Sequence, residues 1–238
     1  MDSPAAANVF GTLGAVLWSL QVETNFSSLS STFFLSWAVA GVPLGVYNIA
    51  DDFNIALQIQ PNILIFLSLW TWFQCKYYGD KWGTRKIVAS VIGIAIVLAG
   101  AEVGLVYALK LARERGHMWP SILMAIVAAI LLAGGVLRHY LQMLKTRSDA
   151  GLSLKFATLD LSGDVASLLS VIFQKTLKIY GIVIYGSELA IWAGLIGLAI
   201  HYRRVSNGDF NKRPKVDAVV LGRGETRAAG RNEENQSV

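Results

Sequence analysis

Four carboxylic acids lie inside long apolar stretches of the sequence, at Glu102, Asp160, Asp164 and Glu188. An ionised carboxylate at the centre of a bilayer costs about 2.5–3.5 kcal/mol to insert, so acids in such stretches need a partner or a function. Asp160 and Asp164 are four residues apart, which places them on one face of a helix, one turn from each other. Two carboxyl groups in a poorly hydrated site cannot both ionise cheaply, so one should hold an exchangeable proton near neutral pH. The pair therefore predicts a proton-coupling site.

A packing role for the same acids is the alternative. Intramembrane carboxylates also bond to polar side chains of neighbouring helices and fix how those helices pack. For Asp164 and Glu188 both interpretations stay open, and Glu188 is also a candidate contact for a solute. For Glu102 we favour packing, because it lies in the fourth apolar stretch, the presumed connector between the two halves of the chain.

Amide and aromatic side chains in the other apolar stretches are candidates for lining a central cavity. Amides can bind the carboxylate or the amine of a small zwitterion without the cost of a buried charge, although they also form interhelical hydrogen bonds. These predicted substrate-binding residues, together with Glu188, are Trp37, Tyr47, Asn48, Gln58 and Gln60. Pro43 and Pro61 lie within the same stretches and free backbone carbonyls there, so we expect them to act as hinges.

The composition indicates what must position these residues. Of the 238 residues 54% are apolar and only 16% are charged, and the mean hydropathy is +0.48. A soluble fold of this size needs more polar surface, so the chain is predicted to be a membrane protein. The net charge of +5 does not indicate nucleic-acid binding, because eight of the 21 Lys and Arg residues lie in the last 36 residues. A disordered chain and a coiled coil are excluded as well.

Seven apolar stretches are long enough, or nearly long enough, to span a bilayer as helices. They cover residues 9–22, 32–50, 55–78, 87–109, 121–143, 156–173 and 182–202. An odd number of spans places the termini on opposite sides, and Arg203 and Arg204 directly follow the last span. Since basic residues favour the cytoplasmic side, the C-terminus is predicted to be cytoplasmic and the N-terminus lumenal or external. The polar tail from Arg203 onward is predicted to be disordered.

The sequence offers little support for an enzyme. Cys75 is the only cysteine, and His117, His139 and His201 are too far apart in sequence for a metal-ligand pattern. No nucleophile–base pair is apparent, so we predict no catalytic residues, no metal site and no cofactor. A seven-helix G-protein-coupled receptor fits the number of spans, but a weak internal repeat argues against it.

That repeat relates residues 29–37 to residues 152–160 at a constant offset of 123, with Leu-Ser and a Phe matching. Spans 1–3 and 5–7 would then be two parallel copies joined by span 4, because an odd connector gives both copies the same orientation. Many transporters are built from such repeats, with the binding site between the halves.

Several ordered motifs resemble the PQ-loop repeat family, which includes cystinosin-like and fungal transporters of the SWEET-like superfamily. They are residues 135–153, 159–164 with 167–170, Trp37 with 41–48, 58–61, and 186–192. The resemblance covers about residues 9–202, although the Pro-Gln dipeptide that names the family is missing from both copies, and Arg138-His139 stand near its place in the second. It implies an all-α integral membrane fold of two parallel three-helix bundles joined by a connector helix. The Asp at the position of Asp160 is linked to proton coupling in that family.

The resemblance sets the predicted organisation. Residues 1–86 would form the first, divergent three-helix bundle, 87–118 the connector helix and its loop, 119–202 the second bundle, and 203–238 the cytoplasmic tail. The expected function is proton-coupled export of an amino acid or similar zwitterion from an acidic organelle by alternating access, in a vacuolar, lysosomal or other endomembrane. The expected partners are the solute, protons and the lipid bilayer, with no nucleic acid; a homo-oligomer stays open. A non-transporting receptor or trafficking scaffold on the same fold is the alternative.

Overall fold

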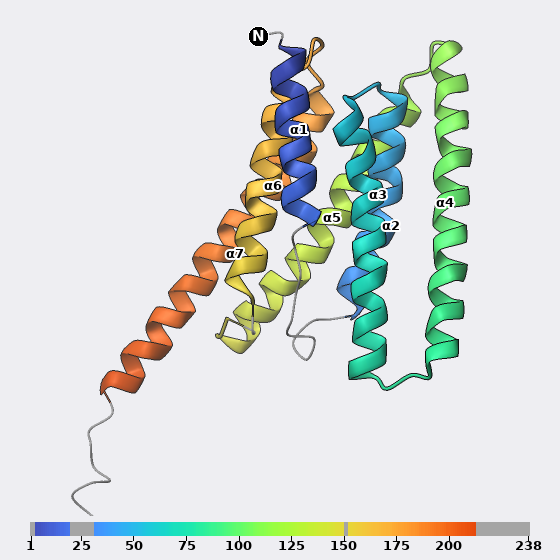
Figure 1. The fold of residues 1–238 in the computed structure, drawn as a ribbon. Coiled ribbons are helices and arrows are strands. Elements are labelled where there is room, and N and C mark those ends of the chain that lie inside the picture. The colour runs from blue at the N-terminus through green and yellow to red at the C-terminus, as the bar shows by residue number, and fades with distance from the viewer. Residues whose placement is uncertain (1–2, 20–30, 150–151, 213–238) are drawn as a thin grey trace, which may run out of the picture.

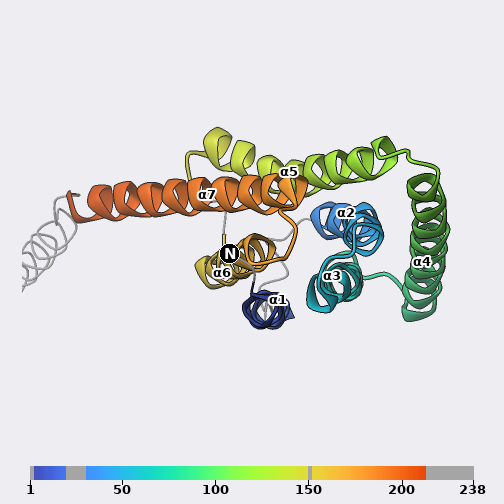
Figure 2. The same cartoon turned by 90° about the horizontal axis from the view of Figure 1, so that it is seen from above.

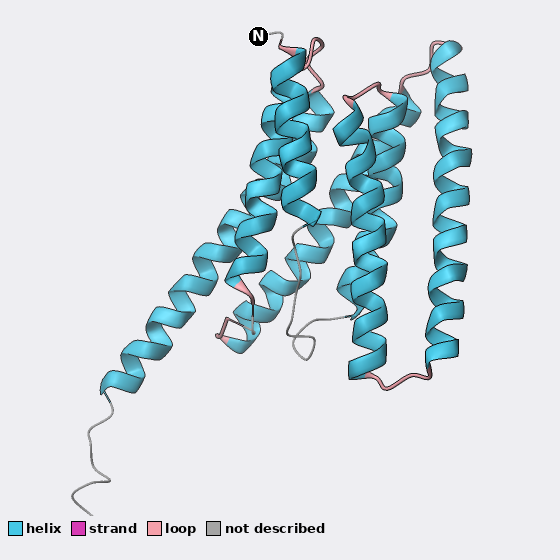
Figure 3. Ribbon diagram, in the orientation of Figure 1, coloured by secondary structure: helices cyan, strands magenta, loops and turns pink. Residues whose placement is uncertain are grey.

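A computed structural model describes residues 3–19, 31–149 and 152–212. Within these ranges the chain is helical, without strands (Figures 1 and 3). The elements are α1 (Pro4–Ser19), α2 (Ser31–Ala50), α3 (Ile55–Gln74), the π-helical turn η1 (Cys75–Gly79), α4 (Thr84–Glu114), α5 (Trp119–Thr146), α6 (Leu154–Ile172) and α7 (Ile179–Lys212). Each of the seven predicted spans has a matching helix.

Five of these helices are long and apolar enough to cross a bilayer: α2, α3 with η1, α4, α5, and α7 as far as Val205. Helix α1 is a shorter apolar helix. Helix α6 is outside this group and carries the two aspartates, Asp160 and Asp164. The chain is therefore a helical, multi-pass membrane protein, as its composition predicts.

The contacts between helices follow the same pattern in both halves of the chain. Helix α3 contacts both α1 and α2, and α7 contacts both α5 and α6. Across the middle, α1 packs against α6 and α2 packs against α5. Figure 2 shows α5 and α7 side by side along one edge, with α4 at the far end of the bundle, where it contacts α2 and α3.

Glycines allow α1 to approach α6 closely. A Cβ added at Gly14 would lie 2.7 Å from the hydroxyl oxygen of Ser167 and 3.2 Å from the carbonyl oxygen of Gly163. Only a residue without a side chain fits there without displacing α6. Because α6 carries the two aspartates, this contact holds the acid-bearing helix against α1.

Helices α1 and α7 depart from the sequence-based boundaries in ways that bear on the fold. Helix α1 begins at Pro4 and ends at Ser19, earlier than the predicted span of 9–22, whose last residues lie outside the described ranges. Helix α7 continues to Lys212, although a disordered tail was expected from Arg203. Arg203 is held because its guanidinium donates to the Asp149 carboxylate at 2.7 Å and to the Leu152 carbonyl at 2.6 Å. The rest of the predicted tail, 213–238, lies outside the described residues.

Candidate functional site

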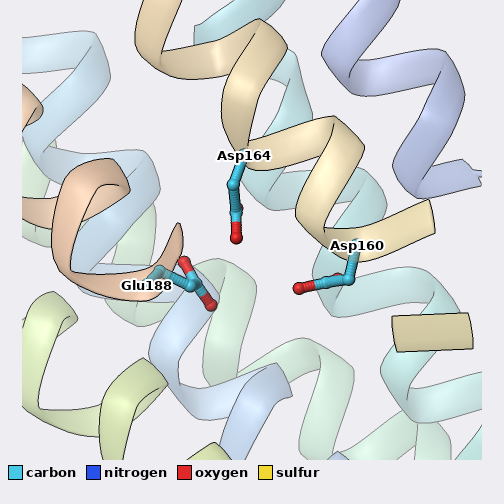
Figure 4. Close-up of side chains that lie close together, drawn as sticks. All are labelled: Asp160, Asp164 and Glu188. Carbon is cyan, nitrogen blue, oxygen red and sulfur yellow. The ribbon is translucent and has the colours of Figure 1, made fainter. Parts of the chain in front are cut away.

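Three carboxyl groups meet between α6 and α7. Asp160 and Asp164 project from successive turns of α6, and Glu188 faces them from α7 (Figure 4). One oxygen from each group lies within 4.8 Å of the others. The three residues are only 1%, 0% and 2% exposed. We call these three residues the acidic cluster.

Asp164 and Glu188 of the acidic cluster lie without a cation partner among the described residues. Both carboxylate oxygens of Asp164 and the Oε2 atom of Glu188 are buried and accept no hydrogen bond from the described residues. Neither residue forms an ion pair with any described Lys, Arg or His. Three adjacent, buried negative charges would repel one another strongly. The arrangement is suited to holding protons or the positively charged group of a ligand.

A layer of polar side chains lies next to the acidic cluster. The side-chain amide of Gln60 donates to the hydroxyl of Ser167 at 2.9 Å, three residues after Asp164 on α6. The amide of Asn48 donates to the Tyr185 hydroxyl at 3.2 Å, three residues before Glu188 on α7. Since residues three apart on a helix are neighbours, α2 and α3 reach the flanks of the acids through these bonds.

Asn48 also satisfies a backbone group that Pro61 leaves free. Proline has no N–H, so Pro61 cannot donate to the carbonyl of Leu57 four residues earlier. The amide of Asn48 donates to that carbonyl at 2.7 Å instead. Asn48 thus connects the interrupted turn of α3 to Tyr185 beside the acidic cluster.

An aromatic cluster closes one side of the site. Phe156 is one turn before Asp160 on α6, and Trp192 is one turn after Glu188 on α7. With Trp37 of α2 they form a group whose ring centroids are 6.0–6.3 Å apart. All three are buried. They separate the acids from the end of the bundle at which α6 begins and α7 ends.

The opposite end of the bundle, near the N-terminus in Figure 1, is held by ion pairs. The Asp51 carboxylate lies 3.2 Å from the Arg113 guanidinium and 3.0 Å from the Lys178 ammonium group. Both cations also donate to backbone carbonyls, Arg113 to Ala50 and Lys178 to Asp51 itself. Asp51 follows α2, Arg113 lies in the last turn of α4, and Lys178 precedes α7. Their contacts therefore hold three connections together. We call these three residues the end cluster.

A cavity of about 300 Å³ lies under the end cluster. Asp51, Arg113 and Lys178 line it, together with Tyr47, Ser121 and Tyr180. Tyr47, which directly precedes Asn48 in α2, packs against Phe53 with ring centroids 5.3 Å apart. A solute in this cavity would therefore be adjacent to the polar layer, with Tyr47 at the boundary.

The structure brings some of the predicted site residues together and separates others. Asp160, Asp164 and Glu188 meet, Asn48 and Gln60 flank them, and Tyr47 lines the cavity. Trp37 instead packs in the aromatic cluster. Gln58 is half-buried and donates to the Phe53 carbonyl at 2.6 Å. Pro43 and Pro61 are buried inside α2 and α3.

Two neighbours of the acidic cluster were missed by sequence reasoning, Ser167 and Tyr185. The signal for both was helical spacing, because each is three residues from an acid that was identified. Glu102 lies apart from the cluster, where the Asn62 amide donates to it at 3.1 Å.

Two relatives are similar over most of their length. An uncharacterised protein of Schizosaccharomyces pombe is 35% identical over 203 residues, covering 82% of this chain and 71% of the relative. An uncharacterised membrane protein of Saccharomyces cerevisiae is 29% identical over 224 residues, covering 88% of this chain and 72% of the relative. No model of a known protein family matches the chain, and no solved structure matches it.

Proposed function

The chain belongs to the family of membrane proteins that includes this Schizosaccharomyces pombe relative, and on that premise we propose that it is a transporter that moves a small solute together with protons. The observation that carries the proposal is the acidic cluster. Asp160, Asp164 and Glu188 are buried between two helices, and neither Asp164 nor Glu188 forms an ion pair with the described residues. Such a cluster weakens a membrane protein unless it binds something positive in its working cycle.

The helix contacts support a PQ-loop or SWEET-like arrangement for this transporter. In the proposed arrangement α1–α3 and α5–α7 are two parallel three-helix bundles, and α4 connects them. The matching contacts α1–α3–α2 and α5–α7–α6, and the paired contacts α1–α6 and α2–α5, are those expected from two copies of one unit. Transport sites commonly lie between such repeats, near the middle of the membrane.

The substrate that fits best is an amino acid or a similar zwitterion. Its ammonium group would be bound by the acidic cluster and by the buried Oδ1 atom of Asn48, which accepts no hydrogen bond from the described residues. Its carboxylate would be bound by amide donors such as Gln60. Protons bound at Asp160 and Asp164 would balance the charge of the acids while the solute is absent.

Alternating access would use the two closed ends of the site. The end cluster with Tyr47 would separate on one side, and the aromatic cluster of Trp37, Phe156 and Trp192 on the other. Pro43 and Pro61 would allow α2 and α3 to bend. With the N-terminus lumenal and the C-terminus cytoplasmic, this cycle exports solute from an acidic vacuolar or lysosomal compartment, since protons flow down their gradient in the same direction.

Flux measurements in reconstituted vesicles test this proposal. Vesicles holding the full-length protein and a panel of labelled amino acids are given an imposed pH gradient. Proton-driven flux should occur for at least one amino acid and be abolished by Asp160→Asn. Glu102→Gln is the matched control, because it removes another buried carboxylate but leaves the acidic cluster unchanged. Undiminished flux in the Asp160→Asn variant would overturn the proton-coupling role.

A receptor or trafficking scaffold that transports nothing is the second candidate. The feature that favours it is the absence of both Pro-Gln dipeptides, with Arg138-His139 near the place of the second. An absence of flux across the whole amino-acid panel, with correctly folded protein in the vesicles, would support this alternative.

A further inference from the structure

The last turns of α5 form a groove on the outside of the helix bundle. The groove has a volume of about 430 Å³ and is lined chiefly by Gly134, Leu137, Arg138, Leu141, Gln142 and Lys145. Gly134 has no other group within 4 Å of the position of a Cβ, which leaves the inner end of the groove open. None of the lining residues belongs to the acidic cluster, and the transport proposal does not use them.

The groove contains two cations without an acid. Arg138 and Lys145 are exposed and form no ion pair with the described residues. Asp149, the nearest acid along the chain, accepts from Arg203 instead. Lys145 in the last turn is favoured there by the helix dipole, but Arg138 lies two turns earlier, where the dipole contributes little.

The position of Arg138 along α5 favours a polar or charged partner for its side chain. Arg138 lies eight residues before the end of α5 at Thr146, which corresponds to about 12 Å along the helix axis. Its neighbours Leu137 and Leu141 are 48% and 49% exposed, as expected of side chains that face lipid. A guanidinium at that depth is costly in hydrocarbon unless it reaches a polar or charged partner.

The spacing of the polar side chains matches one elongated occupant. Arg138, Gln142 and Lys145 are at positions i, i+4 and i+7, so they share one face of α5. Leu137 and Leu141 form the adjacent face. A ligand that fits both faces has a negative, phosphate-bearing end and an apolar body.

We propose that this groove binds an anionic phospholipid of the leaflet at which α5 ends. The headgroup phosphate lies between Arg138, which extends outward to meet it, and Lys145, and the Gln142 amide donates a third hydrogen bond. An acyl chain packs along Leu137 and Leu141. Arginine suits this position because its planar fork binds phosphate oxygens in a bidentate manner.

Lipid retention measured by native mass spectrometry tests the proposal. Full-length protein is equilibrated with phosphatidylcholine and phosphatidylserine, and the bound lipids are counted for the wild type, Arg138→Gln, Lys145→Gln and Arg138→Lys. The wild type should prefer phosphatidylserine by about thirtyfold, the value expected from two cations near a headgroup. Arg138→Gln should remove most of that preference, and Arg138→Lys should restore part of it.

Arg85→Gln is the matched control. Arg85 is an exposed cation near the start of α4, at the same end of the bundle, and forms no ion pair with the described residues. Its substitution should leave the lipid preference unchanged. An unchanged preference in both Arg138→Gln and Lys145→Gln, in variants with the melting temperature of the wild type, would overturn the proposal. Displacement of the lipid by millimolar inorganic phosphate would overturn it too, because the groove would then be a site for free phosphate.

Discussion

Acids at the end of the bundle and acids in its middle have opposite surroundings. Asp51, in the end cluster, lies within 3.2 Å of two cations. Asp164, in the acidic cluster, is completely buried and has neither a cation nor a hydrogen-bond donor among the described residues. The ion pairs of Asp51 explain why it is tolerated, since they hold three connections together. No described residue compensates Asp164 in this way, which is why we propose a functional role for it.

Glu102 is intermediate between these two cases. It is buried on α4, lies against Gly45 of α2, and accepts one hydrogen bond from Asn62 of α3. A neutral donor satisfies one oxygen without neutralising a charge. The position of Glu102 where α4 meets α2 and α3 is in keeping with the packing role that the sequence favours for it.

Asp164→Asn should have the largest effect on transport and should not destabilise the protein. We expect proton-driven flux to fall by about two orders of magnitude, as when a proton-transfer group is removed. The melting temperature in detergent should stay the same or rise, because the substitution removes a buried group that has no partner to lose. A melting temperature lowered by several degrees with flux intact would show that the acid is structural and would break the comparison.

Asp51→Asn, in contrast, should lower the stability of the protein. Without the carboxylate, Arg113 and Lys178 face each other in a partly buried site, and we expect a loss of about 1–3 kcal/mol in the free energy of unfolding. Thermal unfolding measures this loss. Asp52→Asn is the control, since Asp52 is 83% exposed and 3.9 Å from Arg113, and it should change stability by less than about 0.5 kcal/mol. Equal losses in the two variants would contradict the assignment of the end cluster as a structural tie.

Helical periodicity in the sequence was sufficient to predict the pair of aspartates on α6, but not the third acid, which comes from α7. That Asp160 and Asp164 share a helix face follows from their spacing alone. The position of Glu188 beside the two aspartates depends on how α7 packs against α6. No local sequence pattern predicts that packing. Trp37 was expected in the cavity for its chemistry, yet Phe156 and Trp192 provide an aromatic surface on which it packs.

The end cluster shows the same limit. Asp51, Arg113 and Lys178 belong to three different connections, and no local sequence pattern pairs them. Which cation would meet which acid depends on the distances between three helix ends. Helix existence was likewise readable from apolar stretches, whereas the helical continuation of α7 past Arg203 depends on contacts with Asp149 and Leu152.

Gly14→Ala sharpens the comparison by testing how tightly the middle of the bundle is packed. The new methyl group would overlap the hydroxyl of Ser167, which bonds to Gln60 beside the acidic cluster. We expect a loss of about 1–2 kcal/mol in the free energy of unfolding, the lower range for overpacking, because a hydroxyl can rotate away. Gly100→Ala on α4 is the control, since nothing lies within 4 Å of its added Cβ, and it should leave the protein equally or more stable. A neutral Gly14→Ala would mean that α1 and α6 are loosely associated.

Glu102→Gln should have the smallest effect of the four substitutions. It tests whether a buried acid outside the acidic cluster contributes to transport. The carboxamide has nearly the same shape as the carboxylate, and its oxygen can still accept from Asn62, so we expect the free energy of unfolding to change by less than about 1 kcal/mol. Proton-driven flux should be that of the wild type, because no other described acid groups with Glu102 to share a proton. A strong loss of flux would mean that any buried carboxylate in this fold contributes to transport, and that the grouping of Asp160, Asp164 and Glu188 is not what distinguishes them. Unchanged flux, beside the loss expected for Asp164→Asn, would instead identify the clustering of carboxyl groups as the functional feature.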